Sequence, residues 1–347
     1  MKKNPSPAIL ETRRVTRGAA CLCCITLFLL ALPCPHVQAK VSGSCNNCHT
    51  MHDSQDDASM RQSGSGTTLL IEDCVGCHSS NTAETIVNGT PIVYNTVPPT
   101  NPLAGGNFHW VAKGGADNDV FGHNVWGISD EDNNIPASAG APGRDSTPAC
   151  NGCHQSLATD PADNCFDKSG CQGCHTEVSH HDDSKPWFRF LKGHRSDDHY
   201  VTGIEAANWE HDPDNAADRN VYQGADATTF TSNYTLKSTH AVTAFCSGCH
   251  SSFHEDMGGV TSPWIRHPND ILLPTTGEYG AYNPLNTYSN EAPVAYLDPA
   301  NPSRAEAVVS CLSCHRAHGS DQPDMLRWDY DNMAEGTGCY VCHTSKD

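Results

Sequence analysis

The stretch CNNCHTMH, from Cys45 to His52, places two cysteines and two histidines within eight residues. Its first five residues follow the pattern Cys-x-x-Cys-His, which returns six more times along the chain. The seven copies are CNNCH (Cys45), CVGCH (Cys74), CNGCH (Cys150), CQGCH (Cys171), CSGCH (Cys246), CLSCH (Cys311) and CYVCH (Cys339). One chemistry, repeated seven times, therefore dominates this sequence.

Several kinds of site use cysteines and histidines, and the spacing separates them. Zinc sites use Cys-x-x-Cys pairs but have no need for a histidine after every second cysteine. A disulfide framework does not couple cysteines to histidines, and thioredoxin-like pairs occur singly beside a βαβ pattern that we do not find here. Cys-x-x-Cys-His is the attachment signature of c-type haem. The sequence thus predicts seven covalent haems.

In such a motif the two thiols bind the haem covalently and the histidine becomes the proximal iron ligand. The predicted attachment residues are Cys45, Cys48, Cys74, Cys77, Cys150, Cys153, Cys171, Cys174, Cys246, Cys249, Cys311, Cys314, Cys339 and Cys342. The predicted proximal ligands are His49, His78, His154, His175, His250, His315 and His343.

Residues 1–39 read as a secretory signal peptide. A basic start precedes the apolar run from Ala19 to Leu32, which is short for a bilayer span, and Val37-Gln38-Ala39 resembles a cleavage site. The leader holds five Lys/Arg and one Glu of the 21 basic and 40 acidic residues, which leaves 16 basic and 39 acidic residues and a net charge of −23. This charge disfavours nucleic-acid binding, and we expect no membrane-spanning segment in the mature chain.

The motifs are arranged in pairs. Those starting at Cys45 and Cys74 are 29 residues apart and those at Cys311 and Cys339 are 28 apart, whereas Cys150 and Cys171 are 21 apart and Cys246 stands alone. After the leader we therefore expect an N-terminal dihaem segment with a long loop (40–148), a central trihaem segment (149–250) and a C-terminal dihaem segment (251–347).

Two motifs carry a second histidine three residues after the first. These are His52 after His49 and His318 after His315. On a helical turn the second histidine points to the same side as the first but cannot reach the opposite face of the same haem. We therefore expect each to ligate a neighbouring haem, His52 that of Cys74 and Cys77, and His318 that of Cys339 and Cys342.

The remaining distal ligands come from histidines outside the motifs, of which the mature chain has twelve. We predict five of these, His123, His180, His194, His240 and His267, in addition to His52 and His318. His181 and His254 are substitutes, and His109, His199 and His211 are left unassigned. Cys165 is the one mature cysteine outside the motifs, and we expect a buried thiol near the Cys171 haem, with a free thiol or an intermolecular link as alternatives.

The chain resembles the multihaem c-type cytochromes with doubled Cys-x-x-Cys-His motifs from metal-reducing bacteria. The resemblance rests on the seven motifs and on stretches such as FGHNVWGI, FRFLKGHR, SPWIRHP and CLSCHRAHGS. It implies an exported protein that is periplasmic, associated with the outer membrane or extracellular. Its implied partners are other redox proteins and extracellular metal oxides, and some relatives polymerise into filaments.

Haem content also predicts the fold class. Seven haems in 308 mature residues leave about 44 residues for each, too few for separate domains. We expect a single elongated multihaem unit with a haem core, mostly irregular, with short α-helices and very little β-structure. One hairpin is expected in IVNGTPIVY, residues 86–94, because Asn-Gly favours a tight turn.

The predicted function is electron transfer through seven bis-histidine haems in anaerobic or extracellular respiration, without enzymatic activity. Histidine on both iron faces and the negative charge of the chain both favour low reduction potentials. Two alternatives stay open at this point. One is a multihaem reductase of nitrite, hydroxylamine or sulfur oxyanions, which needs one open iron position. The other is a subunit of a polymerising filament.

Overall fold

The computed structural model describes residues 44–52, 54–55, 58–59, 69–113, 118–132, 157–158, 169–181, 187–193, 199–210, 219–227, 236–250 and 267–345. The chain divides into two units. One comprises Gly43–Ser179 with Ser184–Asp347, and contains most of the described residues. The other comprises Met1–Ser42 with His180–Asp183, of which only His180 and His181 are described, both exposed. The signal-peptide prediction lies outside the described residues, and the division of the chain at 148 and 250 stays a prediction.

Helices in the described part of the chain are all five residues or shorter. The α-helices are α2 (Cys74–His78), α3 (Leu236–Thr239), α4 (Val242–Cys246) and α6 (Cys339–Cys342). The 3₁₀ helices are η1 (Cys45–Asn47), η2 (Val111–Lys113), η3 (Asp119–Phe121), η6 (Gly170–Gly173), η7 (Phe188–Phe190), η9 (Gly277–Tyr279), η10 (Arg304–Glu306), η11 (Cys311–Ser313) and η12 (Pro323–Met325). The predicted irregular chain with short helices is thus confirmed.

Strands are two or three residues long. The first six are β1 (Ser54–Gln55), β2 (Ala58–Ser59), β3 (Ser79–Ser80), β4 (Ile86–Val87), β5 (Thr90–Pro91) and β6 (Tyr94–Asn95). They form the pairs β1–β2, β3–β6 and β4–β5. The predicted hairpin is confirmed, because β4 and β5 pair antiparallel around Asn88 and Gly89, whose φ angles are 50° and 79°. Positive φ at both central residues is the geometry of a type I′ turn.

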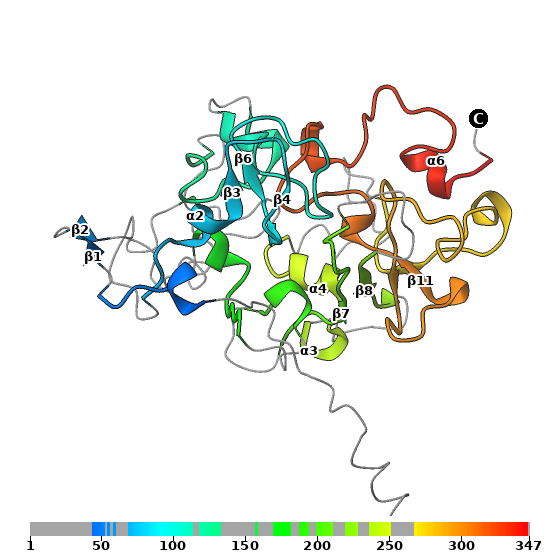
Figure 1. Cartoon of the computed structure of the whole chain (residues 1–347). Helices are drawn as coiled ribbons and strands as arrows, with labels where there is room; N and C mark the ends of the chain where they lie inside the picture. Colours follow the sequence, from blue (N-terminus) through cyan, green and yellow to red (C-terminus); the bar gives the residue numbers. More distant parts are fainter. Residues whose placement is uncertain are drawn as a thin grey trace, which may run out of the picture. The chain divides into compact units, whose positions relative to one another are not determined.

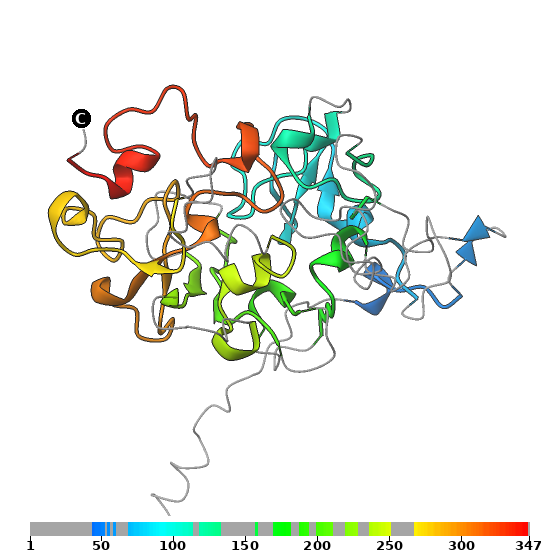
Figure 2. The same cartoon turned by 180° about the vertical axis from the view of Figure 1, so that it is seen from behind.

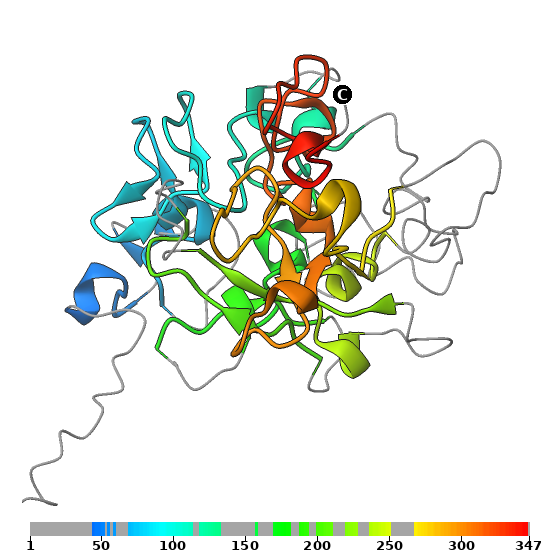
Figure 3. The same cartoon turned by 90° about the vertical axis from the view of Figure 1, so that its right-hand side faces the viewer.

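The larger unit also contains a five-stranded sheet, which the sequence did not predict. Its strands are β7 (Gly203–Ile204), β8 (Val221–Gln223), β9 (Ile271–Leu272), β10 (Ala295–Tyr296) and β11 (Ala307–Val309), in the order β7-β8-β10-β11-β9. β8 and β10 are parallel and the other neighbours antiparallel. Figure 3 shows these green, yellow and orange strands separate from the cyan strands β3 to β6.

The sheet has a hydrophobic cluster on each face, as the alternation of side chains along a strand requires. Tyr296, Ala307 and Val309 belong to one cluster, whereas Ala295 and Val308 belong to the other. The second cluster also contains Val242 of α4, so the sheet packs directly against the turn that leads into the Cys246 motif. Figure 1 shows α4 beside β7 and β8. The sheet therefore provides a packing surface for the helix that ends at Cys246.

Segments far apart in sequence meet around the last two motifs. The His318 backbone N–H donates to the Gly105 carbonyl at 2.7 Å, and Asn107 donates to the Gly319 carbonyl at 2.9 Å. At the C-terminal end, Thr344 donates to the Glu278 carbonyl of η9 at 2.8 Å. Figure 2 shows the red α6 beside the yellow segment that contains η9. Non-local contacts thus hold both C-terminal motifs in place.

Candidate haem-binding sites

The described motifs share one local geometry. Each contains a single helical turn in which the histidine backbone N–H donates to the carbonyl of the first cysteine. For His49, His175, His250 and His343 this bond is 2.9 Å long, and for His315 it is 3.0 Å. At α2 the Asp73 side chain caps the turn by accepting from Gly76 N at 3.0 Å. A turn of this kind directs two thiols and an imidazole to one side, as covalent haem attachment requires.

Proximal histidines donate their Nδ1–H to backbone carbonyls. The bonds are His78 to Pro91 O at 2.8 Å, His175 to Arg189 O at 2.9 Å and His315 to Asp324 O at 2.7 Å. Because a carbonyl oxygen only accepts, Nδ1 carries the proton in each case. The lone pair then lies on Nε2, the atom that binds iron when Nδ1 is held in this way. His343 differs, since its Nδ1 lies 3.4 Å from a Glu278 carboxylate oxygen.

Histidines outside the motifs show the same arrangement. The bonds are His123 Nδ1 to Ala317 O at 2.7 Å, His240 to Tyr200 O at 2.8 Å, His267 to Pro268 O at 2.9 Å and His109 to Asn95 O at 2.8 Å. The first three are predicted distal ligands. His109 was left unassigned by the sequence, yet it is buried and its Nε2 has no hydrogen-bond partner. The residue spacing around His109 did not indicate this role, because the carbonyl that accepts its Nδ1–H belongs to Asn95 in strand β6.

The ring centres of three pairs of imidazoles lie at a distance that fits two ligands of one metal ion. The ring centres of His175 and His318 are 6.2 Å apart. Those of His267 and His343 are 6.2 Å apart and those of His123 and His250 are 6.0 Å apart. A metal ion lies about 2.0 Å from a ligating histidine nitrogen and therefore about 3.1 Å from the ring centre, so two rings on opposite sides of one ion are about 6.2 Å apart. The residues present thus fit an iron held by a motif histidine and a distal histidine.

The position of His318 favours another haem than the one expected from the sequence. The spacing of CLSCHRAH predicted that His318 serves the haem of Cys339 and Cys342. In the structure it faces His175, the histidine of the Cys171 motif, and its ring stacks on Phe108 with centres 4.8 Å apart. Residues 105–108 pack against His318, so we propose the Cys171 haem as its site in place of the Cys339 haem.

Burial keeps several of these imidazoles neutral. It lowers the pKa of His123, His175 and His315, and lowers that of His318 to about 3. Only the neutral imidazole can donate a lone pair to a metal. The lowered pKa values therefore keep these side chains ready for ligation at neutral pH.

Cysteines of different motifs lie next to one another. The Cys171 thiol hydrogen-bonds with that of Cys74, which raises the pKa of Cys171, and Cys246 hydrogen-bonds with Cys311. Cys48 lies near enough to Cys77, Cys249 to Cys174, and Cys339 and Cys342 to Cys314, for the charge of one thiolate to raise the pKa of the other thiol. These neighbouring cysteines place the six described motifs in one series. Named by their first cysteines, the motifs follow in the order Cys45, Cys74, Cys171, Cys246, Cys311 and Cys339.

Other predicted residues are not brought together, or are not described. His52 is exposed, as is the neighbouring Met51 at 85%. His180 and His181 are exposed residues of the smaller unit. Cys150, Cys153, His154, Cys165, His194, His211 and His254 lie outside the described residues. Their assignments stay predictions.

Known proteins share the motif and the fold. The family model described as "Doubled CXXCH motif" matches residues 304–347. The filament of outer membrane cytochrome S from Geobacter sulfurreducens is similar in structure, with a TM-score of 0.50 and 18% sequence identity over 84% of this chain and 85% of that chain. OmcS nanowires of the same organism give a TM-score of 0.47 and 17% identity over 86% of each chain. No curated protein matches the sequence.

The motifs and the fold define a class. With its doubled motifs and its irregular chain of short helices, the protein is similar to the multihaem c-type cytochromes, and it carries the signature of covalently bound haem c. One solved structure with a similar fold is a cytochrome of Geobacter sulfurreducens, in agreement with the resemblance in sequence. Among the described residues, no helix is long and apolar enough to cross a membrane.

Proposed function

We propose that this protein carries electrons along seven covalently bound haems with histidine on both iron faces. Each haem supplies one-electron exchange between ferric and ferrous iron. The observation that carries the proposal is the set of three opposed imidazole pairs at 6.0–6.2 Å, each joining a motif histidine to a distal one. Such pairs would occupy both axial positions of three of the seven haems and leave none of these open for a substrate.

The series of cysteine contacts supports transfer along a line. It joins motif to motif from Cys48 and Cys77 to Cys314 and Cys342, so each haem attached there lies beside the next. The third motif, at Cys150, completes the count of seven. His109 becomes an eighth candidate for the seven distal positions because its buried Nε2 has no hydrogen-bond partner, beside the three paired distal histidines and His52, His180, His194 and His240.

Haem count and spin state test the proposal directly. Intact mass of the matured protein should correspond to seven haems on a chain that begins near Lys40. Low-temperature EPR of the oxidised protein should show low-spin ferric iron throughout, and the reduced protein should not bind carbon monoxide at neutral pH. A high-spin signal from one haem would instead support the reductase alternative.

The setting we propose is anaerobic respiration outside the inner membrane, in the periplasm, at the outer membrane or outside the cell. Other redox cytochromes and extracellular metal oxides are the partners we expect, because bis-histidine ligation favours the low potentials that such acceptors need. Stopped-flow mixing of the reduced protein with ferric oxide or ferric citrate should reoxidise all haems. Failure with both acceptors would argue for a purely periplasmic partner.

A second candidate function is assembly into a filament. The similar structure is that of a filament, and the first motif of this chain has exposed residues at Cys45 and Met51. An exposed terminal haem could then lie against the last haem of a second copy. Negative-stain electron microscopy and light scattering of the matured protein should show polymers, whereas a monodisperse monomer at high concentration would reject this candidate.

A further inference from the structure

Two tight turns in the structure have a backbone conformation that their sequences disfavour. In η7, Arg189 has φ 47° and ψ 32°, and Phe190 has φ 61°. In η12, Asp324 has φ 58° and ψ 21°, and Met325 has φ 58°. Two successive residues with positive φ form a type I′ turn, which favours Asn and Gly, as found at Asn88 and Gly89. Large side chains in this conformation are strained, and strain of this kind concentrates at functional positions.

Both turns present the carbonyl of their first left-handed residue to a haem-motif histidine. Arg189 O accepts from His175 Nδ1 at 2.9 Å and Asp324 O accepts from His315 Nδ1 at 2.7 Å. The turns also close in the same way, with Leu191 N donating to Phe188 O at 2.8 Å and Leu326 N donating to Pro323 O at 3.2 Å. The segments WFRFL and QPDML therefore act alike although they share only their final leucine.

We propose that these two left-handed turns are positioning elements, which fix the orientation and donor strength of the axial ligands His175 and His315. The inference rests on the proposed function, in which both histidines bind haem iron. A hydrogen bond from Nδ1–H to a fixed carbonyl makes the imidazole a stronger electron donor and locks its ring. A stronger donor stabilises ferric iron and lowers the reduction potential.

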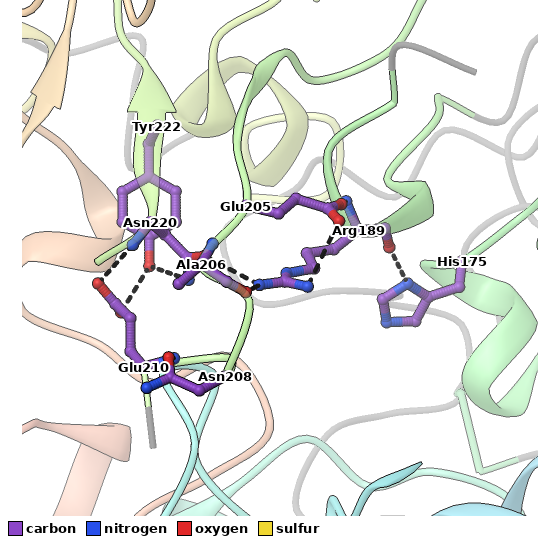
Figure 4. A network of polar contacts seen from close by, with 8 residues as sticks. All are labelled: His175, Arg189, Glu205, Ala206, Asn208, Glu210, Asn220 and Tyr222. Atoms are coloured by element: carbon purple, nitrogen blue, oxygen red, sulfur yellow. Dashed lines mark hydrogen bonds and ion pairs between the residues drawn. The ribbon is translucent and has the colours of Figure 1, made fainter. Parts of the chain in front are cut away.

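Side chains hold the first turn, and Figure 4 shows the network. Glu205 accepts from the backbone N–H of Arg189 and lies 3.4 Å from its guanidinium. The same guanidinium donates to Ala206 O at 2.7 Å and to Asn220 Oδ1 at 3.1 Å. Asn220 N in turn donates to the buried Glu210 at 2.8 Å. Glu205 thus binds both the backbone and the side chain of Arg189. These two contacts hold the Arg189 carbonyl in its strained position.

The second turn is held by backbone bonds to the motif itself. Arg316 N donates to Met325 O and Arg327 N donates to Cys314 O, both at 2.9 Å. His315 and Leu326 form an antiparallel bridge. Among the described residues no ion pair holds this turn, so its dihedral angles can be tested by substitution.

The first experiment compares Asp324→Val with Asp324→Asn. Both variants lose the same carboxylate, but valine disfavours positive φ whereas asparagine tolerates it. In an EPR-monitored redox titration, Asp324→Val should move one low-spin signal, that of the Cys311 haem, to higher potential and change its g values. Asp324→Asn should retain the g values of the unaltered protein. Equal shifts in the two variants would overturn the proposal.

The second experiment compares Glu205→Gln with Glu177→Gln. Glu177 is a matched control because it pairs with Lys192 at 2.6 Å, lies two residues from His175 and does not contact Arg189. Glu205→Gln should raise the potential of the Cys171 haem and change its g values, and Glu177→Gln should change neither g values nor linewidth. The proposal fails if both variants behave alike.

Haem attachment separates failure of this inference from failure of the proposed function. In the unaltered protein, the tryptic peptides containing Cys171 and Cys311 should each carry one haem. If a peptide carries none, the proposed function is wrong at that motif. If both carry haem and the Asp324 and Glu205 variants leave the g values unchanged, the function stands and the positioning role is rejected.

Discussion

The two terminal pairs of motifs share a sequence pattern, but the structure surrounds their second histidines differently. CNNCHTMH and CLSCHRAH both place a histidine three residues after the proximal one. His52 is exposed beside the exposed Met51. His318 stacks on Phe108, faces His175, and has a shielded Nδ1 next to Gly105.

The difference shows that the three-residue spacing excludes one haem for each second histidine, namely the haem of its own motif. The packing of the chain around the histidine then decides which other haem it can reach. Both second histidines are barred from the haem of their own motif by the same helical offset. Only His318 is enclosed by another segment, because residues 105–107 bond to residues 318–319 across more than two hundred residues of sequence. A distal histidine from a segment so far away in sequence would also cross-link the two segments through the haem iron. Four predictions test this comparison.

Removal of His318 should have the largest effect. His318→Ala should convert the Cys171 haem to high-spin iron or to a substitute ligand, since the ring opposite His175 is lost. It should also lower the free energy of unfolding by about 2 kcal/mol, because a buried cross-link disappears. EPR and denaturant unfolding measure the two effects. A fully low-spin spectrum would show that His318 is not a ligand.

His52→Ala should separate ligation from stability. All seven haems should stay attached, and one haem, which we expect to be that of Cys74 and Cys77, should lose low-spin character and rise in potential. The free energy of unfolding should change by less than about 0.5 kcal/mol, because His52 is exposed. Mass spectrometry, EPR and denaturant unfolding provide the readouts. If the spectrum and potentials do not change, His52 is a surface residue.

Crowding His318 should have an intermediate effect. A Cβ added at Gly105 would lie 3.1 Å from His318 Nδ1, so Gly105→Ala should tilt the ring and shift the g values of one haem, at a cost of about 1 kcal/mol. Gly280→Ala is the control, because its Cβ would meet only backbone atoms of residues 275–277. Identical EPR spectra for Gly105→Ala and the unaltered protein would contradict the close packing around His318.

The smallest effect concerns pH and one buried carboxyl near the C-terminal pair. Burial, followed by the nearby Cys311, raises the pKa of Asp270 from 3.8 to about 9. The folded protein thus holds a proton that the unfolded chain releases above pH 3.8, and stability is lost as the pH rises toward 9. Asp270→Asn, whose side chain tolerates the φ of 50° found there, should therefore be more stabilising at pH 8 than at pH 5. Denaturant unfolding of the variant and the unaltered protein at both pH values measures this. The same gain in free energy of unfolding at pH 5 and pH 8 would contradict the prediction.

Sequence patterns predicted the local part of the fold well. The hairpin at Asn88 and Gly89 forms because Asn-Gly favours positive φ, a preference that acts within four residues. The central sheet could not be predicted in this way. Its strands are two or three residues long, too short to show a period, and β8 pairs with β10 across more than seventy residues.

The sequence by itself predicted which residues bind haem covalently, because two thiols and a histidine at this fixed spacing form the attachment motif within one helical turn. It also determined that His52 and His318 cannot ligate the haem of their own motif. Only the tertiary structure brings together the imidazole pairs that we propose as axial ligands, His318 with His175, His123 with His250 and His267 with His343. It also decided that Arg189 and Asp324 present strained carbonyls to two of the motif histidines. The physical reason is range: motif chemistry acts over five residues, whereas a distal ligand and its supporting carbonyl reach the iron only after distant segments have packed.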